Sequence, residues 1–211
     1  MDALKLKNSG LYYVNVGGLV LQTVDGRNFF NGPETPYFDA EWDDINIAER
    51  YPTQTEFAEK MRNVALEYFW MIDKAKDIAI NAHKEQKDKS GKDYYSEHID
   101  AVANSVFRYE KNLVATVVAY LHDILEDTDV TEESLRESFP KDVADAVVVL
   151  THKKNESYDD YIKRVKKNEL ARLVKIYDLA NNMDLTRIDN PNEEDINRVL
   201  KYAKAYSYLM K

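Results

Sequence analysis

Four ionisable side chains are concentrated on one short stretch of the sequence: His122, Asp123, Glu126 and Asp127. In a helix that advances about 100° per residue, all four fall within an arc of about 140° that borders an apolar arc. The apolar arc consists of Val114, Val117, Val118, Leu121 and Leu125. Charged groups beside a packing face cost free energy unless a cation or another partner compensates them. His122 and Asp123 offer the nitrogen and oxygen ligands that divalent ions take, so they form a candidate metal site. The alternative is the solvated acidic end of a helix.

A further acidic residue, Asp178, stands in a stretch of otherwise apolar and basic residues, 170–177. On a helix, Asp178 shares one narrow arc with Ala171, Lys175 and Asn182. A carboxylate in such surroundings needs a partner, and two partners fit the sequence. One is an ion pair with Lys175. The other is a metal ion, with Asn182 one turn further on as a hydrogen-bonding neighbour.

A third segment adds another imidazole, because His98 precedes the helical stretch that starts at Ile99. His98, His122, Asp123 and Asp178 together can bind one divalent ion and leave positions open for water and substrate. A bound divalent ion lowers the pKa of its water and neutralises charge on a phosphoryl oxygen, and a nearby carboxylate can accept the proton. Lysines of the preceding loop form either a basic island that would offset phosphate charge or part of a solvated loop. They are Lys84, Lys87, Lys89 and Lys92.

Composition narrows the class of protein. The chain has 211 residues, 44% of them hydrophobic, and its 29 Lys and Arg against 38 Asp and Glu give a formal net charge of -9. The absence of cysteine excludes a disulfide scaffold, a zinc finger and a thiol nucleophile. The acidic balance argues against nucleic-acid polymers as partners. No apolar run approaches the roughly 20 residues that cross a bilayer, and no signal region follows Met1, so we expect a cytoplasmic protein without a membrane partner.

The elements that must position these side chains are mostly helices. From Thr53 onward apolar residues recur at helical spacing, and strand-like runs are absent after residue 60. The loop 84–92 follows the first helix. The later helices are predicted at 97–109, 112–126, 131–139, 141–151, 157–166, 168–183 and 192–209. We therefore expect a mainly α fold, a helical bundle over residues 53–211.

The first 52 residues are of a different kind. Leu11 to Phe30 resemble a β-hairpin, because two β-rich runs flank the turn signal Gly17-Gly18. Residues 31–52 are acidic and contain Pro33 and Pro36, which predicts a loop. We expect residues 1–52 to form a small N-terminal β-hairpin appendage with an acidic loop extension.

An ordered series of short motifs resembles one known family. The series comprises Lys89-Ser90-Gly91, Tyr94-Tyr95, His98, the block Leu121-His122-Asp123-Ile124-Leu125-Glu126-Asp127-Thr128, and the block Val174-Lys175-Ile176-Tyr177-Asp178-Leu179-Ala180-Asn181-Asn182. Over about residues 73–187 the chain resembles the hydrolase domain of RelA/SpoT-type alarmone enzymes and the small alarmone hydrolases. That domain is a branch of the HD-domain metal-dependent phosphohydrolases.

The resemblance implies a fold, a reaction and roles for individual residues. It implies an HD-type helical bundle that removes the 3′-pyrophosphate of guanosine tetra- or pentaphosphate in the stringent response. His98, His122, Asp123 and Asp178 correspond to ligands of one divalent ion, usually Mn²⁺. Glu126 and Asp127 correspond to the acidic pair that activates or orients the attacking water. The substrate-binding candidates are Lys89, Asn182, Lys175 and His83.

The sequence departs from the family at several positions, and these departures leave other functions open. Asp88 stands where the family has the arginine that helps to hold the guanine base, and Asn181 stands where it has histidine. The metal set is intact, so one alternative is an HD phosphohydrolase for another nucleoside polyphosphate, such as a deoxynucleoside triphosphate. A second alternative is a non-catalytic interaction module that retains its metal. The expected partner is a small nucleotide, and homo-oligomers are left open.

Overall fold

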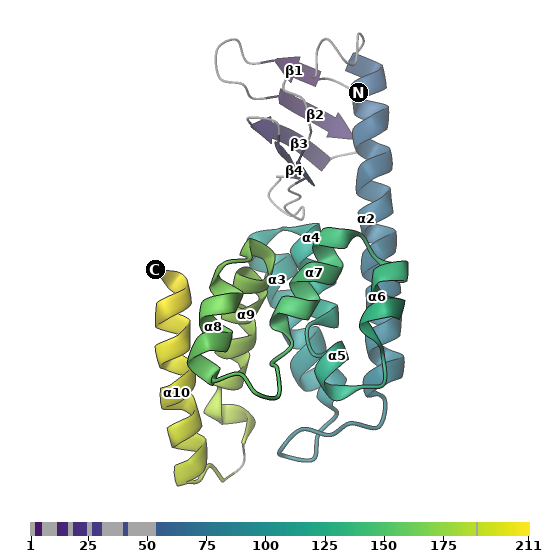
Figure 1. Cartoon of the computed structure of the whole chain (residues 1–211). Coiled ribbons are helices and arrows are strands. Elements are labelled where there is room, and N and C mark those ends of the chain that lie inside the picture. Colours follow the sequence, from purple (N-terminus) through teal and green to yellow (C-terminus); the bar gives the residue numbers. More distant parts are fainter. Residues whose placement is uncertain are drawn as a thin grey trace. The chain divides into compact units, whose positions relative to one another are not determined.

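The computed structural model describes five short strands, residues 54–188 and residues 190–211, with side chains from Glu67 onward (Figure 1). The chain divides into two compact units. One comprises Met1–Ile72 with Phe107–Val114, and the other comprises Asp73–Val106 with Ala115–Lys211. All of the predicted site residues belong to the second unit.

The first unit contains an antiparallel sheet in which neighbouring strands follow one another along the chain, in the order β1-β2-β3-β4-β5. The strands are β1 Ala3–Lys5, β2 Tyr12–Val16, β3 Leu19–Val24, β4 Arg27–Phe30 and β5 Ala40–Glu41. The predicted turn Gly17-Gly18 lies outside the described residues. Within the predicted loop 31–52 only β5 is described. The hairpin appendage and its boundary at residue 52 therefore stay predictions.

Helices and the loops that connect them make up the rest of the described chain, which confirms the expected mainly α fold for this part of the protein. The first, α2, runs from Gln54 to His83 and contains the division between the two units. The others are η1 Tyr95–Ile99, α3 Asp100–Glu110, α4 Leu113–Leu121, α5 Ile124–Asp127, α6 Glu132–Ser138, α7 Lys141–Leu150, α8 Tyr158–Lys166, α9 Glu169–Asn182, η2 Leu185–Arg187 and α10 Glu193–Met210.

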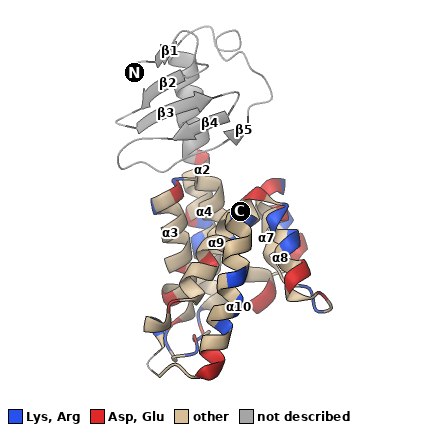
Figure 2. Ribbon diagram, turned by 90° about the vertical axis from the view of Figure 1, so that its left-hand side faces the viewer, with Lys and Arg blue, Asp and Glu red and all other residues tan. Residues whose placement is uncertain are grey.

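Side-chain caps explain why four of these helices begin close to their predicted starts. Thr131, Ser157, Asn168 and Asn192 each accept a hydrogen bond from a backbone N–H of the first turn of α6, α8, α9 and α10. Such caps satisfy amide groups that have no partner within the helix. At α10 the cap is reciprocal, because the Asp195 side chain accepts from the Asn192 backbone. The acidic first turn of α10, visible at its lower end in Figure 2, also suits the positive end of the helix dipole.

One predicted helix is wrong in a way that matters for the site. The sequence predicts a single helix over 112–126, whereas α4 ends at Leu121 and α5 begins at Ile124. Asp123 lies between them with φ −103° and ψ 1°, outside the helical region. The predicted helix 97–109 also differs, because its start is the π-helical turn η1, which contains His98. Departures of this kind are frequent at functional sites.

Helix α9 organises the second unit, since it packs against α7, α8 and α10 and contacts η1. Figures 1 and 2 show α8, α9 and α10 as neighbours. Apolar residues from several helices form the core of the second unit, each contributing about 1.5–3 kcal/mol when fully buried. Buried examples are Ile99, Leu121, Ile124, Val147, Val165, Val174 and Leu179. The core thus fixes the segments that carry the predicted ligands.

Among the described residues, each helix is either too short or too polar to cross a lipid bilayer.

Candidate metal centre and cleft

Three buried side chains from three separate segments meet at one point. They are His98 in η1, His122 after α4 and Asp178 in α9, each about 2% exposed. His98 Nε2 lies 3.1 Å from His122 Nε2 and 3.2 Å from Asp178 Oδ1, and His122 Nε2 lies 3.8 Å from the same oxygen. Within the described residues, these three are the group whose ligand atoms lie close enough together to hold one ion.

Asp123, the fourth predicted ligand, lies beside this group on its more exposed side. Its Oδ2 atom is 3.3 Å from His98 Nε2 and 3.2 Å from His122 Nε2, and the side chain is 21% exposed. The interruption between α4 and α5 turns His122 and Asp123 toward the same point, although the two residues are adjacent in the chain. The four predicted ligands are therefore brought together.

The outer nitrogens of both imidazoles already have partners. His98 Nδ1 lies 2.7 Å from Asn181 Oδ1, and His122 Nδ1 lies 2.7 Å from the backbone oxygen of Ala119. Both partners accept hydrogen bonds, so both Nδ1 atoms donate, and in a neutral ring the Nε2 atom then carries a lone pair. Two Nε2 lone pairs that face each other and a carboxylate repel one another unless a cation lies between them. The residues therefore fit a divalent metal ion with nitrogen and oxygen ligands.

The electrostatics of the group favour positive charge at the same point. Burial lowers the pKa of His98, but Asp123 and Asp178 outweigh it and raise the pKa to about 9. The same balance, burial against the two carboxylates, raises the pKa of His122 to about 10. Burial raises the pKa of Asp178, yet Lys175 and the imidazoles hold it well below its ordinary value. Asp178 is therefore a carboxylate throughout the physiological range, as a metal ligand must be.

Asp178 has both of the partners that the sequence left open. Its Oδ2 atom lies 2.6 Å from Lys175 Nζ, while its Oδ1 atom faces the imidazoles and accepts from Asn182 Nδ2 at 2.6 Å. Burial lowers the pKa of Lys175, but Asp178 reverses the effect and holds it well above its ordinary value. The ion pair with Lys175 thus uses one carboxylate oxygen and leaves the other for the metal position.

A cleft of about 330 Å³ opens beside the metal position. Glu126 and Asp127 line it from α5 and are exposed. Glu126 Oε2 accepts from the backbone N–H of His152 at 3.0 Å, and Asp127 Oδ2 accepts from Gln86 Nε2 at 2.9 Å. Each of these hydrogen bonds uses one carboxylate oxygen, and both carboxylates lie at the cleft, where a carboxylate can accept a proton. The other lining residues include His98, Asp123, Tyr158, Tyr161, Lys175, Asp178, Asn182, Lys201 and Tyr202.

Two of the predicted substrate contacts lie away from this cleft. Lys89 lines a neighbouring recess of about 220 Å³, where its ammonium group forms an ion pair with Asp195. Tyr94, His98 and Asn182 border both spaces. His83 is fully buried and lines neither of them; its Nδ1 atom lies 2.6 Å from Gln86 Oε1. Of the four predicted contacts, Lys175 and Asn182 therefore lie at the cleft itself.

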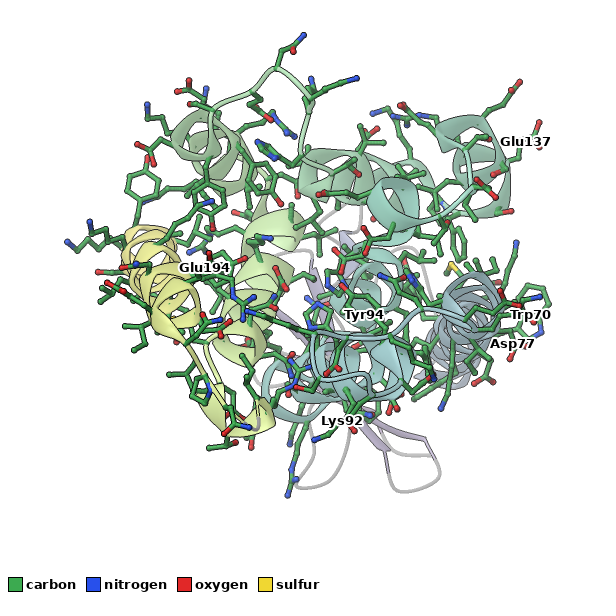
Figure 3. All side chains as sticks on the ribbon, turned by 90° about the horizontal axis from the view of Figure 1, so that it is seen from below. Trp70, Asp77, Lys92, Tyr94, Glu137 and Glu194 are labelled. Carbon is green, nitrogen blue, oxygen red and sulfur yellow. The ribbon has the colours of Figure 1, made fainter. Side chains whose placement is uncertain are left out.

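Tyr94 is a site residue to which sequence reasoning gave no role. Its Oη atom donates to Asp123 Oδ2 at 2.7 Å, and its ring lies 5.1 Å from that of His98. Burial and the neighbouring Asp123 carboxylate raise the pKa of Tyr94, so the hydroxyl keeps its proton. Figure 3 shows Tyr94 amid the side chains of the helical unit, whereas Lys92 and Glu137 lie further out. Tyr94 lies four residues before His98, a spacing that places both side chains on one face of a helix. This spacing could have identified Tyr94 as a site residue from the sequence.

Comparisons with known proteins match the helical part of the chain. Residues 75–175 match a family model described as the HD domain. A protein of Mycoplasma genitalium, described as a probable guanosine-3′,5′-bis(diphosphate) 3′-pyrophosphohydrolase, is 32% identical over 114 residues, which are 54% of this chain and 15% of that protein. A protein of Haemophilus influenzae, described as guanosine-3′,5′-bis(diphosphate) 3′-pyrophosphohydrolase, is 41% identical over 70 residues. These residues are 33% of this chain and 10% of that protein.

A solved structure shares the fold. It belongs to work described as "A metazoan ortholog of SpoT hydrolyzes ppGpp and plays a role in starvation responses". The two structures superpose with a TM-score of 0.55 at 22% sequence identity, covering 67% of this chain and 85% of that one. The curated relatives are far longer than this chain, which spans less than a fifth of their length.

Residues 75–175 thus match the HD domain, in just under half of the chain. More particularly, this part of the chain is similar to the RelA/SpoT-type ppGpp hydrolases, and its buried His98, His122 and Asp178 could hold a metal ion.

Proposed function

We propose that this protein is a metal-dependent nucleotide phosphohydrolase that removes the 3′-pyrophosphate of ppGpp-like alarmones. The observation that carries the proposal is the buried cluster of His98, His122 and Asp178 beside a cleft lined by Glu126 and Asp127. The names of the two bacterial relatives, both 3′-pyrophosphohydrolases of guanosine-3′,5′-bis(diphosphate), support the choice of substrate. We assign the activity to residues 53–211 and treat residues 1–52 as an appendage.

The metal that we propose is Mn²⁺, held by His98, His122, Asp178 and Asp123. When bound, such an ion neutralises phosphoryl charge and makes water more acidic. Two imidazole nitrogens and two carboxylates are also acceptable to other divalent ions, so Mn²⁺ rests on the likeness to the family. Tyr94 holds Asp123 in place through its hydroxyl group.

The chain's own residues then supply positioning and proton transfer. Glu126 and Asp127 lie at the cleft, where a carboxylate can take the proton of the attacking water. In the overall reaction, water adds to the phosphorus atom attached to the ribose 3′ oxygen and the bond between them breaks. The products are pyrophosphate and GDP, and the GDP has a free 3′ hydroxyl group. Lys175 and Lys201 line the same cleft and offset the negative charge of the phosphates.

Product analysis tests this proposal. The purified protein is incubated with Mn²⁺ and ppGpp, and products are separated by anion exchange and identified by mass. We expect GDP and pyrophosphate, and no turnover by the variant Asp178→Asn. If ppGpp stays intact while the protein binds Mn²⁺, the substrate assignment fails.

A second substrate class deserves the same assay because of Asp88. This residue lines the recess next to the cleft and places a carboxylate where the family resemblance implies an arginine for the guanine base. The panel therefore includes deoxynucleoside triphosphates. Cleavage of one of them together with intact ppGpp would support an HD phosphohydrolase of different specificity. No cleavage of any nucleotide by the metal-loaded protein would support an interaction module.

A further inference from the structure

Asn181 accepts hydrogen bonds from two different donors on the same oxygen. His98 Nδ1 lies 2.7 Å from Asn181 Oδ1, and the Arg187 guanidinium donates to the same Oδ1 atom through Nη1. Nη1 also lies 3.4 Å from the Asn181 backbone oxygen. Arg187 thus contacts the residue that holds the outer nitrogen of a proposed metal ligand.

This arrangement determines which nitrogen of His98 carries the proton. A guanidinium group has donors and no acceptor, so the Asn181 atom that faces Arg187 must be the amide oxygen. The same oxygen faces His98 Nδ1, which must therefore donate and leaves the Nε2 lone pair for the metal position. Without Arg187 the amide group can rotate by about 180° and present its NH₂ group to His98, which favours the opposite tautomer.

Arg187 is itself held by the loop that follows α2. Its Nη2 atom lies 3.5 Å from Asp88 Oδ2, and its backbone oxygen accepts from Ser90 Oγ at 2.9 Å. The other Asp88 oxygen accepts from the backbone N–H groups of Ser90 and Lys92, both at 2.9 Å. Gly91, with φ +76°, allows the tight turn between them. Asp88 therefore fixes its own loop and keeps one oxygen for Arg187.

We propose that Arg187, anchored by Asp88, is a positioning residue of the metal centre. It acts through Asn181 on the tautomer of His98 and so sets the affinity for the metal. This inference rests on the proposed metal site and is independent of the proposed substrate. It also gives Asp88 a physical role in this chain, one that differs from contact with a base.

Metal affinity of the folded, metal-free protein tests the proposal. Mn²⁺ binding is measured by isothermal titration calorimetry for the wild type, Arg187→Met and the control Arg136→Met. The control removes the same charge from a surface arginine on α6 that pairs with Glu132 and Asp145. We expect Arg187→Met to bind Mn²⁺ about tenfold more weakly and the control to be unchanged.

The sign of the effect separates positioning from simple electrostatics. Removing a positive charge near a cation site strengthens cation binding if only the electric field acts. Weaker binding by Arg187→Met therefore supports the role through Asn181, whereas unchanged or tighter binding overturns it. If Arg187→Met does not fold, Arg187→Lys, which keeps the charge, takes its place in the same measurement. Unchanged Mn²⁺ affinity of Arg187→Lys would then overturn the proposal.

A double variant and a spectroscopic measurement complete the test. In the Asn181→Ala background, Arg187→Met is expected to cause no further loss beyond about twofold, because the mediating amide is gone. Fully additive losses would contradict the proposed connection. Nitrogen-15 correlation spectra of the metal-free protein, recorded at a pH above the pKa of His98 so that the ring is neutral, should show the proton on His98 Nδ1 in the wild type and partly on Nε2 in Arg187→Met. If the wild type binds no divalent ion, the proposed function fails instead.

Discussion

At the scale of single residues, the two carboxylate oxygens of Asp178 contact different groups, and the site depends on both contacts. One oxygen faces His98 and His122, and the other pairs with Lys175 at 2.6 Å. Because His98, His122 and Asp178 are buried and the Lys175 side chain is only 15% exposed, each charge depends on its partner. The residue types and the spacing along the sequence predicted the four ligands, and the structure brings them together.

Asp178→Asn is expected to abolish Mn²⁺ binding and to destabilise the metal-free protein, because it leaves the partly buried Lys175 ammonium without its carboxylate. Elemental analysis measures the metal, and urea unfolding measures the stability. The double variant Asp178→Asn with Lys175→Met should recover stability without recovering metal. Full metal content in either variant would refute the ligand assignment. Asp145→Asn, on the surface of α7, is the control.

Glu126→Ala combined with Asp127→Ala should reduce turnover of ppGpp by about 10²–10⁴-fold while metal content stays unchanged, because these carboxylates lie at the cleft and outside the buried cluster. Steady-state kinetics and elemental analysis on the same sample measure both quantities. Full activity of the double variant would remove the proton-transfer role.

At the scale of elements, local signals predicted the helices and missed their interruptions. Starts capped by Thr131, Ser157, Asn168 and Asn192 lie within one or two residues of their predicted positions because a cap depends on neighbours in sequence.

Asn192→Ala at the start of α10 should lower the free energy of unfolding by about 1 kcal/mol, because the cap bonds to Asp195 are lost. Asn197→Ala, the same substitution within the exposed part of α10, should have no cost, since alanine favours helix interiors. Urea denaturation measures both. Equal effects at the two positions would show that the cap contributes nothing specific.

Sequence reasoning missed the break between α4 and α5, the hydrogen bond of Tyr94 to Asp123, and the contact of Arg187 with Asn181. Each depends on residues that come together only in the folded protein. Asp123 accepts a hydrogen bond from the hydroxyl group of Tyr94, which lies 29 positions earlier in the chain. Ser90 and Arg187, which hold the recess together, are 97 positions apart. Helical periodicity extends through His122 and Asp123, so it gave no sign that the helix stops there.

The loop between α7 and α8 provides a pH-dependent contribution to stability. The hydrogen bond from Arg164 lowers the pKa of Glu156 to about 2, against 4.5 ordinarily. The ionised form is therefore favoured by folding, and this stabilisation is present above about pH 4.5 and lost as the pH falls toward 2. We expect Glu156→Gln to be less stable than the wild type at pH 7, and the difference to shrink below pH 4.5. Urea unfolding over this pH range measures it; a constant difference would contradict the assignment.

At the scale of the described helical unit, the metal position joins η1, the link between α4 and α5, and α9. An ion that binds only the folded state stabilises it by about 2.7 kcal/mol at a hundredfold excess over its dissociation constant. We expect the thermal midpoint of the wild type to rise with Mn²⁺ concentration and that of Asp178→Asn to stay constant. Differential scanning calorimetry with and without EDTA provides the measurement. An unchanged wild-type midpoint would argue against a metal bound by the native fold.

The mixture of charges along the cleft implies that metal binding is coupled to the release of protons. Four carboxylates, those of Asp123, Glu126, Asp127 and Asp178, face the ammonium groups of Lys175 and Lys201 across the same space. Against the effect of burial, Asp123 and Asp178 raise the pKa of His98 to about 9 and that of His122 to about 10, so both imidazoles carry an extra proton in the metal-free protein at neutral pH. A divalent ion at this position must displace those two protons, and we therefore expect metal binding to release protons and to weaken as the pH falls.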